Sequence, residues 1–342
     1  MIHQRRDTMK RTVKKVMTIA LTMVCATSLY ACGSTSTKTE SSTIVASVAS
    51  ETQYPVTINT YDANGNQITQ TFEKAPERIV TNNLSATETL IELGLQDKIV
   101  GMMTPDNEVT SYYQSSIEQI TKLGDKKSIS KEVVLSATPD IIVGRAAMFS
   151  ENSLGTYLSW NENEINVYAQ GASISASTVS LSSVIEDVKN LGVIFNVQDK
   201  ANAYADELQE KLDKVVAETS TTAELKNALV MCAYDGNTFG AYKSALQEQM
   251  LNTLGYTNKA TGTSGLSLEN LITMDPEVIV YVTSDRNAKN DATAVEDLYN
   301  QESLADVPAI KNKKIITIGY DEFMDYGPAV FDALTTLSDA LK

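Results

Sequence analysis

Short apolar runs alternate with stretches of helical spacing from residue 78 to the end of the chain. The runs are rich in β-branched residues and are bounded by polar or glycine positions, which is typical of buried strands. Such an alternation of strands and helices predicts an α/β fold with parallel sheets. The predicted strands are 78–81, one starting at 99, 140–143, 165–168, 229–233, 278–282 and 315–318.

The helix after the first predicted strand carries a start and a stop signal. Ser85 and Glu88 have the spacing of a capping box, and the apolar residues Leu90, Ile91 and Leu93 follow it. Gly94 comes next, as glycine commonly does where a helix ends. We therefore expect a helix that starts at this box.

One helix–strand unit occurs twice. SKEVVLSATPDIIV at 130–143 reappears 137 positions later as SLENLITMDPEVIV at 267–280, and each copy has a glutamate seven residues before a proline. Because internal self-similarity indicates repeated structural units, the sequence predicts two related α/β lobes with a cleft between them.

The most regular helical pattern lies between the two lobes. Apolar residues recur at helical spacing for about 20 residues from Asp199. At 1.5 Å per residue such a helix is about 30 Å long, enough to reach from one lobe to the other. A single stiff connection permits only modest hinge motion, so we expect a largely preformed cleft.

The first residues indicate export. Six basic residues precede an apolar run at 16–30, which is too short for a membrane-spanning helix. The run ends Leu-Tyr-Ala-Cys, a lipobox-like sequence, so Cys32 is the predicted lipidation site. The alternative is an ordinary secretory signal with an incidental cysteine.

These patterns divide the chain into five predicted parts. They are a lipoprotein signal peptide at 1–31, a Ser/Thr-rich tether at 32–53, an N-terminal lobe at 54–197, an interlobe helix at 198–220 and a C-terminal lobe at 221–342.

The net charge and the scarcity of histidine and cysteine exclude several function classes. Without residues 1–31 the chain has 22 basic and 42 acidic residues, a formal charge of −20 that repels nucleic acid. His3, the single histidine, lies in the signal, so the mature chain has no imidazole for catalysis or for direct metal binding. Cys232 is the one mature cysteine besides Cys32 and has no disulfide partner within the chain. We predict that the protein is not an enzyme, although a carboxylate-only glycosidase remains an alternative.

Several motifs together resemble a known family. The strand motif at 75–80, the helix at 86–94 with Ile99-Val100-Gly101, and the paired Glu-to-Pro repeats are similar to the helical-backbone (class III) substrate-binding proteins of ATP-driven importers for iron-siderophores, haem and cobalamin. The resemblance covers about residues 76–342. It implies two Rossmann-like lobes joined by one long helix, a ligand between them, and delivery to a dimeric ABC permease with a cytoplasmic ATPase.

The resemblance also assigns the repeat glutamates. Glu132 and Glu269 match the carboxylates that pair with permease arginines in this family, and two like charges in pseudo-symmetric positions suit a two-fold partner. The alternative is that each simply stabilises the first turn of its helix.

Two scarce arginines follow the strands of opposite lobes. Arg145 and Arg286 are expected to project into the cleft, where guanidinium groups suit the oxygens of an anionic ferric chelate. An ion pair of Arg286 with Asp285 or Asp291 is the alternative.

Amide and aromatic residues near strand ends complete the predicted site. Haem or cobalamin remains an alternative cargo, with haem held through a tyrosine or a methionine, for example Met102, Met103 or Met148. No resident cofactor and a monomeric protein are expected. The further ligand-contact candidates are Asn82, Asn83, Trp160, Tyr234, Tyr242, Tyr320 and Tyr326.

Overall fold

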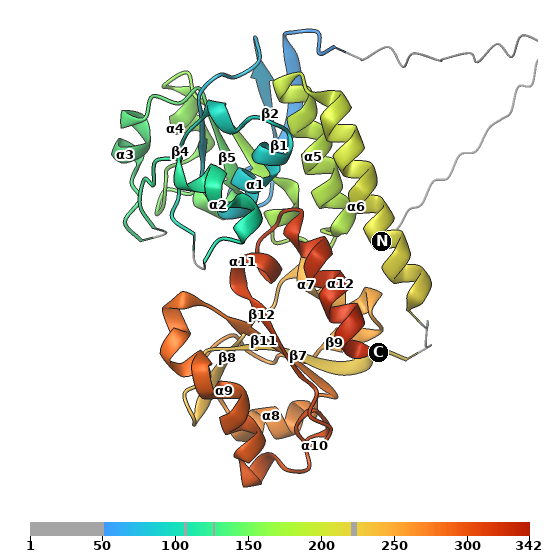
Figure 1. Cartoon of the computed structure of the whole chain (residues 1–342). Helices are drawn as coiled ribbons and strands as arrows, with labels where there is room; N and C mark the ends of the chain where they lie inside the picture. Colours follow the sequence, from blue (N-terminus) through green and yellow to red (C-terminus); the bar gives the residue numbers. More distant parts are fainter. Residues whose placement is uncertain (1–50, 106–107, 126, 220–223) are drawn as a thin grey trace, which may run out of the picture. The chain divides into compact units, whose positions relative to one another are not determined.

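The computed structural model describes residues 51–105, 108–125, 127–219 and 224–342. From residue 51 onward they form one compact unit, in which two α/β lobes lie at opposite ends of a long helix (Figure 1). The predicted two-lobe α/β fold is confirmed. The signal peptide, Cys32 and most of the predicted tether lie outside the described residues.

The N-terminal lobe contains a four-stranded parallel sheet in the order β4-β3-β5-β6. In β5 the residues Ile141, Ile142 and Val143 are all buried, as expected of a strand covered on both faces. The strands are β3 (Ile79–Thr81), β4 (Ile99–Met102), β5 (Ile141–Arg145) and β6 (Asn166–Gln170). The helices are α1 (Leu84–Glu92), α2 (Ser111–Glu118), α3 (Lys131–Ser136), α4 (Tyr157–Asn161) and α5 (Leu181–Phe195).

An antiparallel hairpin, β1 (Val56–Tyr61) with β2 (Gln67–Phe72), precedes this sheet and was not predicted. Its turn is closed by Asp62, whose carboxylate accepts the backbone N–H groups of Asn64 and Asn66. The Asn-Gly dipeptide at 64–65, between two alternating runs, is the signal that could have identified it.

The C-terminal lobe has the predicted parallel strands and, in addition, antiparallel strands at one side of the sheet. Strands β9, β7, β11 and β12 are parallel, whereas β8 runs antiparallel to β7 and to β10. The reason is local: Asp235 accepts the backbone N–H groups of Asn237 and Thr238, which turns the chain straight back after β7.

The elements of this lobe have the following bounds. The strands are β7 (Lys226–Cys232), β8 (Thr238–Ala241), β9 (Tyr256–Asn258), β10 (Leu266–Ser267), β11 (Val278–Thr283) and β12 (Ile315–Gly319). The helices are α7 (Ala245–Thr253), α8 (Leu268–Met274), α9 (Ala288–Asn300), α10 (Pro308–Lys311), α11 (Tyr320–Phe323) and α12 (Ala329–Leu341). Short 3₁₀ turns lie at η1 (Gln96–Lys98), η2 (Ala146–Met148), η3 (Gly171–Ser173), η4 (Asp285–Asn287) and η5 (Glu302–Leu304).

Helix α6 (Gln198–Glu218) connects the two lobes, close to the predicted bounds. It packs on α5, where a Cβ atom at Gly192 would lie 2.3 Å from that of Ala201, so the two helices approach closely. At its other end Lys211 pairs with Asp332 of α12. The helix is therefore attached to both lobes (Figure 1).

The hydrophobic core runs through both lobes. One cluster of buried side chains includes Leu90 in α1, Leu191 in α5, Leu208 in α6, Met250 in α7 and Leu334 in α12. This continuous apolar contact opposes a wide separation of the lobes, because opening them would expose part of it to water.

Candidate ligand-binding site

The loops after the N-terminal strands meet α11 and the segment that follows it in the C-terminal lobe. Asp325, which is 3 % exposed, accepts the backbone N–H of Ser85 at 2.8 Å and the Asn83 amide at 3.4 Å. Next to it, a Cβ atom at Gly327 would lie 2.3 Å from that of Ser85. The lobes are thus joined here by direct contacts across their facing edges.

This junction overturns the predicted capping box. Helix α1 begins at Leu84 after Asn83, and no side-chain cap is formed. The Ser85 N–H donates instead to Asp325, and Glu88 is buried. Because the accepting carboxylate comes from the opposite lobe, local sequence could not reveal it.

Arg145 ends β5 and packs on the C-terminal lobe. Its guanidinium carbon lies 5.0 Å from the centre of the Tyr326 ring. Burial works to lower the pKa of Arg145, but Tyr326, Tyr320 and Asp325 outweigh it and the pKa is raised. The side chain also makes a hydrogen bond with Tyr320. Arg145 is therefore held firmly as a cation between the lobes.

Tyr242 and Arg286 extend this arrangement. The Tyr242 and Tyr320 rings lie 5.8 Å apart. Burial raises the pKa of Tyr242 well above its usual range, while the charge of Arg286 acts in the opposite sense. We call the set Arg145, Tyr242, Arg286, Tyr320 and Tyr326 the arginine–tyrosine seam. The structure thus brings together five of the nine residues predicted to contact a ligand.

The two predicted asparagines are buried and position other groups. Asn82 Oδ1 accepts the Arg145 N–H at 2.7 Å and would lie 2.0 Å from a Cβ atom at Gly144, where φ is +152°. Asn83 donates to Gln170 at 2.9 Å. Neither amide has surface for a ligand, which differs from the prediction, because both are used to hold the strand ends together.

Trp160 and Tyr234 also lie in the core and not in the cleft. Trp160 is 0 % exposed beneath the Lys131 ammonium, 4.9 Å from the ring centre, and its indole nitrogen has no partner in the ranges described. Tyr234 is 1 % exposed and donates to the Gly236 carbonyl at 3.1 Å. Both rings fill space under loops, so their prediction as ligand contacts is not met.

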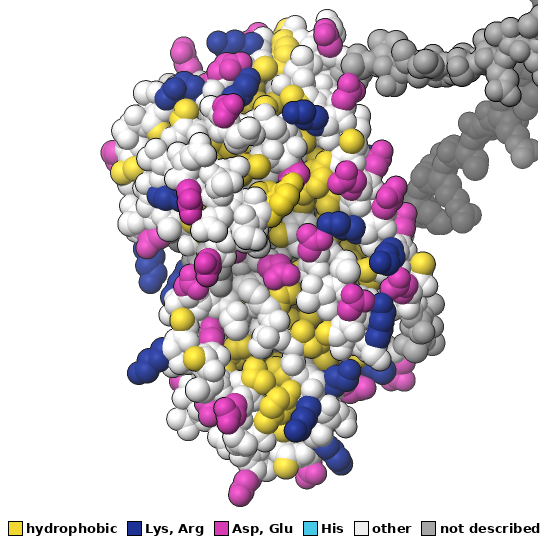
Figure 2. Space-filling view, in the orientation of Figure 1, with side chains coloured by type: hydrophobic (Ala, Val, Ile, Leu, Met, Phe, Trp, Pro, Cys, Tyr) yellow, Lys and Arg dark blue, Asp and Glu magenta, His cyan; other side chains and the backbone are white. Residues whose placement is uncertain are grey.

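A cavity of about 570 Å³ opens beside the seam, between α1, α2, α6 and the C-terminal elements η4, α11 and α12. Asp285 and Asp321, which line it, directly adjoin Arg286 and Tyr320 of the seam. Acidic side chains gather at this level between the lobes in Figure 2. The lining residues are Leu84, Glu88, Glu92, Glu108, Thr110, Tyr112, Tyr113, Tyr204, Glu207, Lys211, Asp285, Gly319, Asp321, Glu322, Ala329 and Asp332.

The acidic lining was missed by sequence reasoning. Its carboxylates come from separate helices and turns, and each taken alone resembles an ordinary solvated position. Glu88 is the exception, because it follows the first strand on an otherwise buried helix. That placement of an acid among buried residues is the signal that could have identified it.

Glu132 and Glu269 lie at matching places in the two lobes. Each is exposed in the first turn of its helix, α3 or α8. Hydrogen bonds from the backbone and from serine lower the pKa of both carboxyls. The largest cause is the residue's own backbone N–H for Glu132 and the Ser267 side chain for Glu269. Both side chains are therefore charged and accessible, as a docking role requires.

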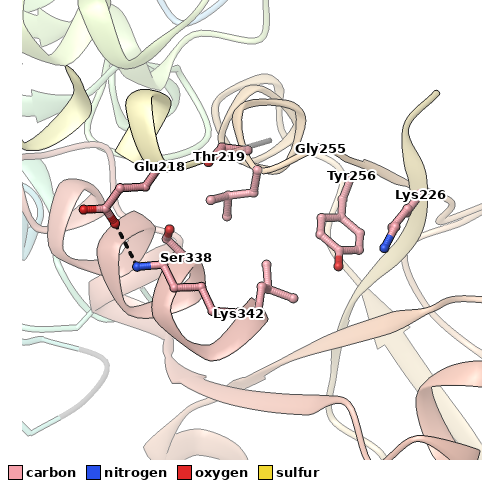
Figure 3. Close-up of a pocket in the computed structure, with 9 residues that line it drawn as sticks. Glu218, Thr219, Lys226, Gly255, Tyr256, Ser338 and Lys342 are labelled. Carbon is pink, nitrogen blue, oxygen red and sulfur yellow. Dashed lines mark hydrogen bonds and ion pairs between the residues drawn. The ribbon is translucent and has the colours of Figure 1, made fainter. Parts of the chain in front are cut away.

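Another hollow, of about 240 Å³, lies where α6 ends and is lined by Glu218, Tyr256 and Lys342 (Figure 3). Glu218 and Lys342 form an ion pair of 2.8 Å beside it. It contains none of the predicted ligand contacts and lies outside the junction of the strand ends.

Neither a metal centre nor a membrane span is found in the described part of the chain. No group of three or more His, Cys, Asp or Glu side chains there is arranged to hold a metal ion. No helix in the same ranges has the length and apolar character to cross a bilayer. Cys232 is buried at the end of β7.

Curated relatives cover most of the chain at low identity. It is 23 % identical over 294 residues to YvrC of Bacillus subtilis, named an uncharacterized ABC transporter substrate-binding lipoprotein, covering 84 % of this chain and 86 % of the relative. It is 23 % identical to the petrobactin-binding protein YclQ of the same organism (89 % and 90 %) and to a cobalamin-binding protein of Halobacterium salinarum (82 % and 72 %).

Solved structures have the same fold. A periplasmic binding protein from Veillonella parvula superposes with a TM-score of 0.72 at 26 % identity, over 85 % of this chain and 92 % of that one. A protein of an Fe³⁺-hydroxamate transport system from Saccharomonospora viridis gives 0.68 at 21 % identity, over 84 % and 99 %. The family model described as periplasmic binding protein matches residues 79–322. With two lobes joined by one long helix and this match over most of its length, the chain belongs to the periplasmic binding protein family.

Proposed function

We propose that this chain is the extracytoplasmic substrate-binding protein of an ABC importer, and that its cargo is a ferric siderophore-type chelate. The observation that carries the proposal is the position of a cavity of about 570 Å³ next to the arginine–tyrosine seam, at the carboxyl ends of strands from both lobes. Ligands of open α/β sheets bind at such ends. The size is that of a small-molecule pocket.

An iron chelate suits this site because its iron is already enclosed by its own oxygen donors. The protein then needs aromatic walls and hydrogen bonds in place of metal ligands, and Tyr112, Tyr113 and Tyr204 line the cavity. The names of the petrobactin-binding relative and of the Fe³⁺-hydroxamate system support this class of cargo. No resident cofactor is part of the proposal.

Cobalamin is the second candidate, since a relative of similar identity is named for it. Haem would need a tyrosine of the cavity lining as its axial ligand. Met102 and Met103 are 0 % and 2 % exposed in the core, so they offer no axial ligand, and Met148 accepts a hydrogen bond from Ser153. The relatives' names describe binding proteins, which agrees with a role that is not enzymatic.

Delivery would use the two exposed glutamates and the lipid anchor. Glu132 and Glu269 would each meet one half of a two-fold permease as the protein, a monomer, docks. Cys32 would hold it at the outer face of the cell membrane. Cys32→Ala should release soluble protein on detergent-free fractionation, and a mutant that stays with the membrane would contradict the anchor.

Native mass spectrometry tests the cargo. The mature protein is incubated with a mixture of ferric hydroxamates, ferric catecholates, cobalamin and haem. We expect a one-to-one complex with a ferric chelate. Tight binding of cobalamin or haem with no ferric chelate bound would replace this proposal with the second candidate.

A further inference from the structure

The interlobe cavity is strongly unbalanced in charge. Among its described lining residues are eight carboxylates and one ammonium, that of Lys211, which is paired with Asp332. The acids come from both lobes and from the helix between them: Glu88, Glu92, Glu108, Glu207, Asp285, Asp321, Glu322 and Asp332. Like charges around one partly desolvated space repel one another, so an empty cavity of this kind is costly.

Among these acids, Glu88 is the most specific candidate to pair with a cationic group. It lines the cavity, it is only 6 % exposed, and within the described residues its carboxylate has no hydrogen-bond or ion-pair partner. Burial, followed by the charges of Asp325 and Asp321, raises its pKa to about 8. Without a partner the buried group is held in its neutral form, and a cation that binds beside it displaces the proton to solvent and pairs with the carboxylate.

Resting on the proposed function, we infer that this cavity selects a ferric chelate that carries a cationic group, such as a pendant ammonium, which binds against Glu88. Tyr112, Tyr113 and Tyr204 add aromatic surface that attracts a cation and covers the apolar part of a chelate. Tyr113 donates its hydroxyl hydrogen to Glu92 at 2.8 Å, so it does not satisfy Glu88. The same lining opposes an anionic chelate, so this inference and the prediction that Arg145 and Arg286 select an anionic cargo are alternatives.

A matched pair of ligands isolates the cationic group. Ferrioxamine B is a ferric trihydroxamate with a pendant ammonium, and its N-acetyl derivative lacks that charge but keeps the iron centre. Calorimetric titration of the mature protein should show ferrioxamine B binding about tenfold more tightly, as a charge-assisted hydrogen bond implies. The preference should shrink with added salt. Ferric enterobactin, an anionic tris-catecholate, should not bind.

Variants then locate the preference. Glu88→Gln keeps the shape of the side chain and should remove most of the tenfold difference while leaving affinity for the N-acetyl form within about twofold. Glu207→Gln, at an exposed lining position on α6, provides a second variant with a smaller loss. Glu296→Gln, exposed on α9 and outside the cavity, is the matched control and should leave the preference unchanged.

The outcomes separate this inference from the proposed function. Equal affinity for the two hydroxamates would overturn the inference and leave the function intact. A preference that survives both Glu88→Gln and Glu207→Gln would overturn the assignment to this cavity. If neither hydroxamate bound, the inference would fall, whereas the ferric-chelate function would fall only if the mass-spectrometric mixture also gave no complex with a ferric catecholate.

Discussion

Glu132 and Glu269 occupy matching exposed positions in the first turns of α3 and α8, whereas the arginines beyond the two repeats lie in different surroundings. Arg145 is half-buried and stacks on Tyr326, but Arg286 is exposed in η4. The repeat is thus symmetric at the edge that a two-fold partner would meet. It is asymmetric at the cleft, and the single ligand proposed to bind between the lobes would require no such symmetry.

The first helix of each lobe carries a carboxylate near its start, and the two carboxylates differ in their hydrogen-bond partners. In the C-terminal lobe Glu248 of α7 accepts hydrogen bonds from the Thr257 hydroxyl at 3.1 Å and the Asn258 N–H at 3.3 Å. In the N-terminal lobe Glu88 of α1 faces the cavity without such donors in the described residues. The satisfied acid serves the fold, and the unsatisfied one is available to a ligand.

The largest effect is expected from the two exposed glutamates at matching positions, Glu132 and Glu269. Reversing both charges, Glu132→Arg with Glu269→Arg, should abolish chelate uptake by cells while the affinity measured by calorimetry stays unchanged, because the proposed docking uses these charges to orient the protein on the permease. Glu296→Arg is the control for a generic change of surface charge. Normal uptake by the double variant would assign both glutamates to helix stabilisation alone.

Glu88→Gln should stabilise the ligand-free protein. The pKa of Glu88 is raised to about 8 from an ordinary 4.5, so the wild-type fold loses stability as pH rises from 4.5 towards 8. The variant should therefore gain on the order of 4 kcal/mol at pH 8 and much less at pH 5, measured as urea unfolding at both values.

Glu248→Gln is the companion measurement, since its carboxylate is satisfied. It should cost about 1 kcal/mol. A Glu88→Gln variant less stable than wild type at pH 8 would contradict the contrast between the two acids.

The arginines should differ in their effect on binding. Arg145→Ala removes the stack on Tyr326 and should weaken chelate binding about tenfold, or roughly 1.4 kcal/mol. Arg286→Ala should weaken it less than about threefold, because the side chain is exposed. Calorimetric titration of both variants with the chelate measures these losses of affinity. Equal losses would show that the two arginines contribute equally to ligand binding.

The smallest effect concerns the helix caps of the repeat. Ser267 forms a reciprocal capping box with Asn270, whereas Ser130 accepts only from the Val133 N–H, at 3.4 Å. Ser267→Ala should cost about 1 kcal/mol and Ser130→Ala about half of that in urea unfolding. A larger loss of unfolding free energy for Ser130→Ala than for Ser267→Ala would show that these capping hydrogen bonds do not set the stability of the two helices.

The sequence by itself determined the repeat, the seven predicted strands of the two lobes and the long helix. These depend on local apolar patterning, which acts in the same way wherever a segment lies in the fold. The rule that ligands bind at the carboxyl ends of parallel strands also led correctly to a meeting of Arg145 with Tyr320 and Tyr326. Helix α6 was predicted almost to its ends because its pattern runs unbroken from Asp199.

Only the tertiary structure decided which of these residues remain accessible and where charge accumulates. Asn83 and Trp160 follow the same local signals as the exposed candidates but are buried by neighbours distant in sequence. The cap that Asp325 provides to Ser85 spans 240 positions. The acidic cavity likewise forms only when helices of both lobes and α6 come together, because burial and charge density are sums over atoms that the chain order keeps apart.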